Sequence, residues 1–467
     1  MPQETVMSDM DNKTIIKYWE YLFSGIFFTG IFIFFAFFYN SHLHFEEQFQ
    51  LFLLTDDFFI TKMSHPGGLS GYIGGFLTQF YYLSLAGPVI ITGLLFALQQ
   101  VMKGILSKVN PSKTLFPVSF LPSLLSALIL CNEFYPLSAL TGFLLAMITG
   151  LIYVRIKIYK FRFFAGLVMI PAVYWLGGGS FLSLLILMFV FEILTSLKSR
   201  EAGPHSFRVW YLIAYLAIGA LIPFLVKQVL ILQPVMMTFM SEFYYNILTG
   251  IPTAVLVLFI LPPLLILLVN NISVKEKKVK FVLPLQIALL LLLCFFGLSL
   301  ANFEAEEVMT YDFLTRNENW EEVLKFAERK PPRNYLSLAM LNLSLAKTGQ
   351  MGNRMFNYNQ HGINGLFLPF NKEYVAPAMG NEVFYHLGLT NASQEYAFES
   401  METIPSMGKS ARLIKRLAET NLINGQYNVS EKYLKLLEKT IFYRKWAKDA
   451  LTYLGDEEKI NNDPDWG

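Results

Sequence analysis

The chain has 467 residues, of which 54% are hydrophobic and 15% are charged. Soluble domains carry about 25% charged residues, so this composition excludes an ordinary soluble enzyme and predicts a membrane protein. A net charge of +2 excludes the basic surface of a nucleic-acid-binding protein, and two cysteines are too few for a disulfide framework.

Nine apolar segments in the first 300 residues approach the length of a membrane-spanning helix, roughly 20 residues. They are Tyr21–Tyr39, Tyr82–Met102, Thr114–Cys131, Leu137–Val154, Phe163–Trp175, Phe181–Leu197, Val209–Val226, Leu248–Val269 and Val282–Leu300. The first lacks the small-residue cleavage site of a signal peptide. Only Gly177-Gly178-Gly179 separates the fifth segment from the sixth. The sequence therefore predicts either nine spans or seven spans and a re-entrant hairpin.

Lysine and arginine are unequally distributed between the two sides of these segments. When the connections are numbered alternately, one side carries sixteen of these residues and the other carries only Lys62 and Lys227. The positive-inside rule then places residues 1–20 in the cytoplasm. An odd number of spans places the residues after 300 outside the cytoplasm. The expected location is the cytoplasmic (inner) membrane of a bacterium.

The first outer loop, residues 40–81, lies within a predicted transmembrane domain of residues 21–300 and collects polar side chains. Its charged residues and histidines are His42, His44, Glu46, Glu47, Asp56, Asp57, Lys62 and His65. Aromatic and aliphatic residues recur at helical spacing over 45–54, which predicts an amphipathic helix in the membrane interface. A second amphipathic segment, Tyr72–Tyr82, leads into the second span.

Two interpretations of the acidic residues in this loop stay open. In one, the carboxylates are solvated at the outer surface and the aromatic residues form an interface belt. In the other, a carboxylate acts as a general base or binds a divalent metal ion. The near absence of Lys and Arg in the outer connections fits both. A metal role for His42 and His44 is disfavoured, because a spacing of two residues does not match one face of a helix.

Polar groups within the predicted spans are few. There is no ladder of Asp, Glu or Arg, such as marks many ion or proton pathways, and no inverted repeat of the transporter kind. A transporter or flippase is therefore the third-ranked interpretation. Glu192, near the end of the sixth predicted span, is expected to reach the interface or to pair with Lys198 or Arg200.

A second domain is predicted for residues 301–467, because the density of charge rises there. Residues 1–300 hold 18 basic and 13 acidic residues, whereas residues 301–467 hold 19 and 22. Short amphipathic helices alternate with turns, most clearly at Asn424-Gly425-Gln426-Tyr427 and more loosely at Gly349 and Gly388. The Asn- and Gly-rich stretch Gly352–Val375 is expected to be a loop.

This alternation of helix, glycine-containing turn and helix resembles tetratricopeptide repeats. The resemblance implies a stack of helical hairpins whose concave surface binds partner proteins, here proteins of the cell envelope. A simpler alternative is a helical cap over the membrane domain. The predicted fold class is therefore all-α, with a polytopic membrane domain followed by a helical-repeat domain.

The membrane part, with its acidic first outer loop, resembles GT-C-type membrane glycosyltransferases. That resemblance implies transfer of a sugar from a polyprenyl-phosphate carrier at the outer leaflet, with an acid of the first loop as base or metal ligand. The catalytic candidates implied are Glu46, Glu47, Asp56 and Asp57. The substrate-binding candidates are Lys62, His65, Tyr72 and Gln79.

The stretches Phe45-Glu46-Glu47-Gln48 and His65-Pro66-Gly67-Gly68 resemble an uncharacterised bacterial family of polytopic membrane proteins with a helical-repeat tail. That family adds a class of protein and no mechanism. Two functions are therefore expected with equal weight. One is an outer-leaflet transferase for lipid-linked sugars, and the other is a non-catalytic membrane scaffold that recruits envelope proteins.

Overall fold

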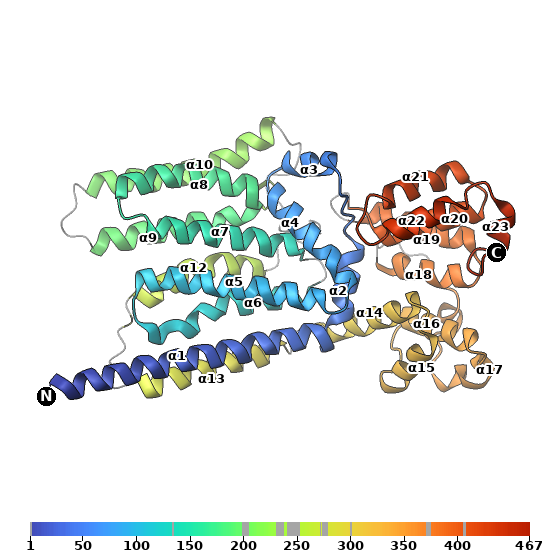
Figure 1. The fold of residues 1–467 in the computed structure, drawn as a ribbon, viewed down its shortest axis with the longest axis horizontal. Helices are drawn as coiled ribbons and strands as arrows, with labels where there is room; N and C mark the ends of the chain where they lie inside the picture. The colour runs from blue at the N-terminus through green and yellow to red at the C-terminus, as the bar shows by residue number, and fades with distance from the viewer. Residues whose placement is uncertain are drawn as a thin grey trace. The chain divides into compact units, whose positions relative to one another are not determined.

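The computed structural model describes residues 2–132, 135–198, 205–229, 238–240, 253–270, 272, 279–298, 301–369, 375–404 and 408–467. Within these residues every regular element is a helix, which confirms the predicted all-α class. The chain divides into two compact units, and Figure 1 labels the helices of both. Each unit is described separately.

Unit 1 comprises Met1–Phe38, Phe59–Leu77 and Leu85–Ala301. Its main helices are α1 (Pro2–Ile33), η1 (Phe34–Phe38), α4 (Gly68–Thr78), α5 (Ala86–Val109), η3 (Lys113–Phe120), α6 (Leu121–Ile129), α7 (Leu137–Arg155), α8 (Tyr159–Gly177), η4 (Gly178–Ser180), α9 (Phe181–Lys198), α10 (His205–Val229), α12 (Thr253–Asn270) and α13 (Val279–Leu298). The helix α3 (Asp56–Met63) crosses the division between the units.

Unit 1 supplies the membrane character of the chain. Among the described residues, six helical segments are long and apolar enough to cross a bilayer: Ile16–Phe38, Ala86–Val109, Leu137–Arg155, Tyr159–Leu197, Val209–Gln228 and Thr253–Asn270. The third and ninth predicted spans contain shorter apolar helices, Thr114–Ile129 and Leu283–Phe295. Residues 248–252 and 299–300 of two predicted spans lie outside the described residues. These helices indicate a membrane protein, and the number of spans stays a prediction.

The fifth and sixth predicted segments form a helical hairpin. The helices α8 and α9 contact each other and both contact α7. The chain reverses at Gly178, whose φ of +60° is readily adopted only by glycine. The two arms have 19 and 18 residues. At 1.5 Å per residue each arm is about 28 Å long, close to the thickness of the hydrocarbon layer, which favours two full spans.

A buried ion pair holds four helices of unit 1 together. The guanidinium of Arg162 on α8 donates to both carboxylate oxygens of Glu192 on α9, at 2.5 and 3.0 Å. The hydroxyl of Tyr153 on α7 donates to the same carboxylate at 2.7 Å and lies 3.1 Å from the hydroxyl of Tyr215 on α10. Glu192 therefore pairs with Arg162, while the side chains of the two predicted partners, Lys198 and Arg200, lie outside the described part of the chain.

Unit 2 comprises Tyr39–Phe58, Thr78–Ser84 and Asn302–Gly467. Its helices are α2 (Asn40–Gln48), η2 (Gln79–Tyr82), α14 (Phe303–Arg316), α15 (Trp320–Arg329), α16 (Tyr335–Lys347), α17 (Met351–Arg354), η7 (Met355–Asn357), η8 (Gly362–Gly365), α18 (Val375–His386), α19 (Thr390–Thr403), α20 (Ala411–Ile423), α21 (Tyr427–Leu437), α22 (Arg444–Leu451) and α23 (Glu457–Asn461).

The same turn recurs four times between consecutive helices of unit 2. In each turn one residue has a positive φ, and the amide that follows it donates to the carbonyl five residues earlier. The residues with positive φ are Glu318, Gly349, Gly388 and Gly425. The amide bonds are Asn319 to Leu314, Gln350 to Leu345, Leu389 to Phe384 and Gln426 to Asn421, at 2.8 to 3.0 Å. This is the Schellman geometry that ends a helix, and here it closes repeated helical hairpins.

Part of the first predicted outer loop folds into the core of unit 2. The helix α2 ends at Gln48, so the interfacial helix predicted over 45–54 is wrong beyond that residue. The chain then runs on without helix, and the amides of Leu51 and Leu54 donate to the carbonyls of Lys409 and Lys439. The apolar residues of α2 recur at helical spacing because one face of α2 packs against α14. A helix that packs against protein has the same apolar spacing as a helix that lies on lipid.

Candidate functional site

The helix α2 carries a run of polar side chains into the interior of unit 2. His42, His44, Glu46, Glu47 and Gln48 are each at most 4% exposed. They are buried because α2 packs between α14 and η2. Buried polar groups must find partners or change their protonation state, so this cluster is the candidate site.

A carboxylate from α14 caps the first turn of α2. The two oxygens of Glu306 accept the backbone amides of Ser41 and His42 at 2.8 and 2.9 Å. These amides have no partner within α2, because they belong to its first turn. Burial raises the pKa of Glu306 to about 7, although both amide bonds oppose the shift. The contact fixes where α2 begins.

An ionic network connects α2 with three other helices. The guanidinium of Arg412 on α20 donates to Gln48 of α2 at 2.8 Å and to both oxygens of Asp312 on α14 at 2.8 Å. It also donates to Glu382 of α18 at 3.1 Å. Burial alone would raise the pKa of Glu382, but Arg416 and Arg412 lower it to about 2. Glu382 is therefore ionised, and each charged group of the network has a partner, as a structural network should have.

The side chains of Glu47 and His44 form neither a hydrogen bond nor an ion pair with the described residues of this network. The Oε1 atom of Glu47 and the Nε2 atom of His44 are buried without a hydrogen-bond partner. Burial raises the pKa of Glu47 to about 7, against the attraction of Arg316 and Arg412. Burial and Arg316 lower the pKa of His44 to about 4, and its ring stacks on Phe313 at 4.4 Å between centroids.

The spacing of these two residues places them on one face of α2, since residues three apart are neighbours on a helix. A carboxyl that titrates near neutrality beside a neutral imidazole can donate or accept a proton. Unsatisfied buried polar atoms are rare in folded proteins and call for an explanation, such as a bound water or a functional role. This pair combines shifted pKa values with buried atoms that have no hydrogen-bond partner.

The predicted site residues are divided between the two units. Glu46, Glu47 and Gln79 lie in unit 2, where the side-chain amide of Gln79 donates to the carbonyl of Gln50 at 2.8 Å. Asp56 and Asp57 also belong to unit 2 and are exposed in the first turn of α3.

The other three predicted residues, Lys62, His65 and Tyr72, lie in unit 1. The Nδ1 atom of His65 lies 2.9 Å from the hydroxyl of Ser64 and 3.0 Å from the carbonyl of Thr61. The ring of Tyr72 packs edge-on against Phe59 at 5.0 Å. Neither unit by itself brings all eight predicted residues together. In the described part of the chain, no three His, Cys, Asp or Glu residues are grouped closely enough to hold a metal ion.

Comparison with known proteins gives a family. The model of a family of unknown function, DUF6057, matches residues 14–467. The chain belongs to the DUF6057 family. No curated protein and no solved structure matches it. The match spans both units, so the two units together are characteristic of the family. Because the function of the family is unknown, the match does not indicate an activity.

The sequence of this DUF6057 chain does not predict the acid that caps α2 or most residues of the network. Glu306, Asp312, Glu382 and Arg412 are buried charges on helices of unit 2. A signal was present for Glu382, which lies in the otherwise uncharged segment Val375–Tyr385. A charge within such a helix is rarely left unpaired when buried. No sequence signal connects these residues with α2.

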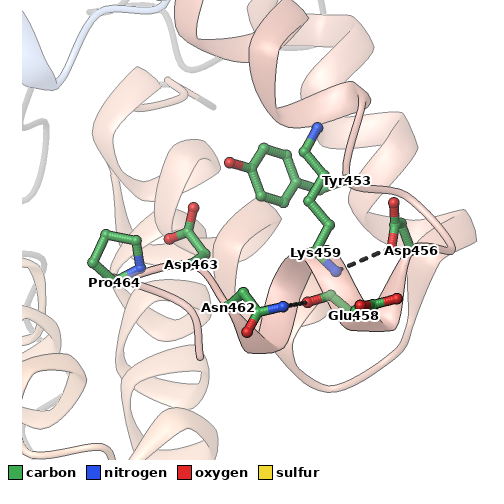
Figure 2. A pocket seen from close by; sticks show the side chains of 7 residues that line it. All are labelled: Tyr453, Asp456, Glu458, Lys459, Asn462, Asp463 and Pro464. Carbon is green, nitrogen blue, oxygen red and sulfur yellow. Dashed lines mark hydrogen bonds between the residues drawn. The ribbon is translucent and has the colours of Figure 1, made fainter.

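Two hollows on unit 2 contain none of the predicted site residues. One, of about 470 Å³, is lined by Tyr453, Asp456, Glu458, Lys459, Asn462, Asp463 and Pro464. Figure 2 shows that polar groups around it form hydrogen bonds with close neighbours in the chain. The backbone amide of Lys459 donates to Asp456, and the side-chain amide of Asn462 donates to the carbonyl of Glu458. The other, of about 420 Å³, lies at the turn that contains Glu318. Neither has the enclosed, apolar form of a small-molecule site.

Proposed function

We propose that this DUF6057 protein is a membrane-anchored adaptor. Its apolar helices hold it in the bilayer, and the helical hairpins of unit 2 bind a protein of the cell envelope. The observation that carries the proposal is the turn repeated at Glu318, Gly349, Gly388 and Gly425. Repeated helical hairpins are the architecture with which tetratricopeptide-like domains present a surface to partners.

An inserted loop between α16 and α18 supports a binding role. Phe356 and Ile363 are 84% and 70% exposed, although the loop itself is fastened by hydrogen bonds. Asn342 donates to the side chain of Gln360 and to the carbonyl of Gly365, both at 2.9 Å. Large apolar side chains displayed on a fastened loop are typical of a protein contact.

The topology proposed with this function has nine spans, a cytoplasmic N-terminus and an extracytoplasmic unit 2, in the inner membrane of a bacterium. The unequal distribution of Lys and Arg supports this orientation. An envelope protein is then the partner that unit 2 can reach.

The second candidate function is a GT-C-like transfer of sugar from a polyprenyl-phosphate carrier. The unpartnered carboxyl of Glu47, whose pKa lies near 7, favours it, because a general base needs a pKa close to the working pH. Its burial in the core of unit 2 argues against direct contact with a lipid-linked substrate. Asp56 and Asp57 are accessible, and with a divalent metal ion they would be the alternative acids.

One complementation experiment separates the two functions. In a strain with a deletion phenotype, Glu47→Gln and Asp57→Asn should restore function, and envelope glycans should be normal. Phe356→Ser combined with Ile363→Ser should fail to restore function at equal protein level. Val429→Ser is the matched control, because Val429 is an exposed apolar residue on another helix of unit 2. Loss of glycans in an inserted and folded Glu47 or Asp57 variant would favour the transferase instead.

A further inference from the structure

The connection between α7 and α8 combines exposed cations with exposed apolar side chains. Arg155 ends α7, Lys157 follows it, and Lys160 lies in the first turn of α8; all three are exposed. Among the described residues none of the three forms an ion pair. Ile158 and Phe161, interleaved with them, are 68% and 64% exposed.

The connection is held in place by the buried ion pair of unit 1. Arg162, which binds Glu192 through two hydrogen bonds, also donates to the carbonyl of Ile156 at 3.2 Å. The amide of Ile156 donates in turn to the carbonyl of Tyr153 at 3.1 Å. A segment that is ordered by such hydrogen bonds loses little conformational entropy when it binds a ligand. The low entropy cost favours binding.

The position of the connection between two apolar helices places it at the surface of the membrane. It joins Leu137–Arg155 to Tyr159–Leu197, two segments that are apolar enough to cross a bilayer. A short connection between two such helices lies at the boundary of the hydrocarbon layer, at the level of the lipid headgroups. Apolar and aromatic side chains enter the interface there, while Lys and Arg reach the phosphate groups. The first amides of α8 have no partner within the helix and also favour an anion.

We propose that residues 155–161 bind the headgroup of an anionic phospholipid. The cations attract the negative phosphodiester, and Ile158 and Phe161 contact the upper part of the acyl chains. The same segment would bind a free phosphate ion poorly, because such an ion uses neither apolar side chain. The inference concerns unit 1 and is independent of the adaptor function proposed for unit 2.

Native mass spectrometry of the purified full-length protein tests this site. The protein is titrated with phosphatidylglycerol or phosphatidylcholine in detergent. We expect tighter binding of phosphatidylglycerol, and a loss of about 100-fold in that preference in the variant Arg155→Gln/Lys157→Gln/Lys160→Gln, since each cation near a membrane surface contributes to the attraction. An equal concentration of inorganic phosphate should not displace the lipid.

The control variant is Lys347→Gln/Lys432→Gln/Lys445→Gln, which removes the same charge from exposed positions of unit 2 and should keep the preference. If the first variant is not stable, Lys157→Gln alone should still weaken the preference about fivefold. The proposal is overturned if the unmodified protein does not distinguish the two lipids, if the variants of residues 155–160 retain the preference, or if the control variant loses it equally.

Discussion

At the residue scale, the acids of the first loop have environments that their sequence neighbours do not reveal. Glu46 and Glu47 come shortly after an apolar segment. Acids at such a position can be solvated, catalytic or buried, and the sequence does not distinguish these cases. Their burial depends on η2 and on α14, and α14 lies more than 250 positions away in the chain. The prediction that this loop is chemically distinctive could be made from sequence, but the partners of its acids could not.

Glu47 provides a test of this environment. Its pKa is raised from 4.5 to about 7, so its contribution to stability is fully present below pH 4.5 and is lost as the pH rises through 7. Glu47→Gln removes the titration and keeps the shape of the side chain. We expect the variant to be more stable than the unmodified protein at pH 8, by at most about 3 kcal/mol, and no more stable at pH 4.5.

Thermal unfolding of both full-length proteins in detergent, from pH 4.5 to 8, measures this difference. The comparison isolates Glu47, because Glu306 and His44 titrate in both proteins. A Glu47→Gln variant that unfolds at a lower temperature than the unmodified protein at pH 8 would show that the ionised carboxylate has a partner that stabilises it.

At the element scale, the local sequence predicts where many helices lie, but it does not predict every turn or every helix end. Gly425 followed by Tyr427 predicts a turn, and the turn is present. The equivalent turn at Glu318 has no glycine and was not predicted, although its hydrogen bonds are the same. The end of α2 at Gln48 was missed because Phe52 and Leu53 continue the apolar spacing beyond the helix.

The repeated turn predicts opposite effects of two substitutions. Glu318 has a φ of +55°, which disfavours a side chain, so Glu318→Gly should stabilise the protein by about 1 kcal/mol. Gly425 has a φ of +71°, and a Cβ added there would meet no atom within 4 Å. Gly425→Ala should therefore destabilise by about 1 kcal/mol through backbone conformation alone.

Thermal unfolding of the two full-length variants provides the measurement, and Val429→Ser, exposed on α21, serves as a control that should change little. If both substitutions shift the unfolding temperature in the same direction, the two turns are not equivalent and the repeated hairpins are not built on one plan.

At the scale of the whole molecule, the chain is organised discontinuously. Composition places a boundary near residue 301, and unit 2 does resume at Asn302. Composition cannot show that Tyr39–Phe58 and Thr78–Ser84 belong to the same unit. The sequence pattern of an amphipathic segment is the same whether its apolar face contacts lipid or protein. Because this loop follows a predicted span, the pattern predicts contact with the membrane interface.

The central claim is that this part of the first loop is a structural component of unit 2. The most direct measurement is to insert a protease site after Ala301, to cleave the purified protein in detergent and to separate the fragments by size. Phe45 belongs to the apolar core formed with α14, α16 and α18, and Phe49 packs against that core. Leu51 packs against the core formed by α20, α21 and α22. Residues 302–467 should therefore remain bound to residues 1–301 after cleavage.

The same cleavage in the variant Phe45→Asp/Phe49→Asp should release residues 302–467, because the contact through the loop is lost. Co-elution of the fragments only when Phe45 and Phe49 are intact is the result that this account predicts. A folded fragment 302–467 that elutes alone from the unmodified protein would contradict it, and would return the acids of the first loop to the membrane surface.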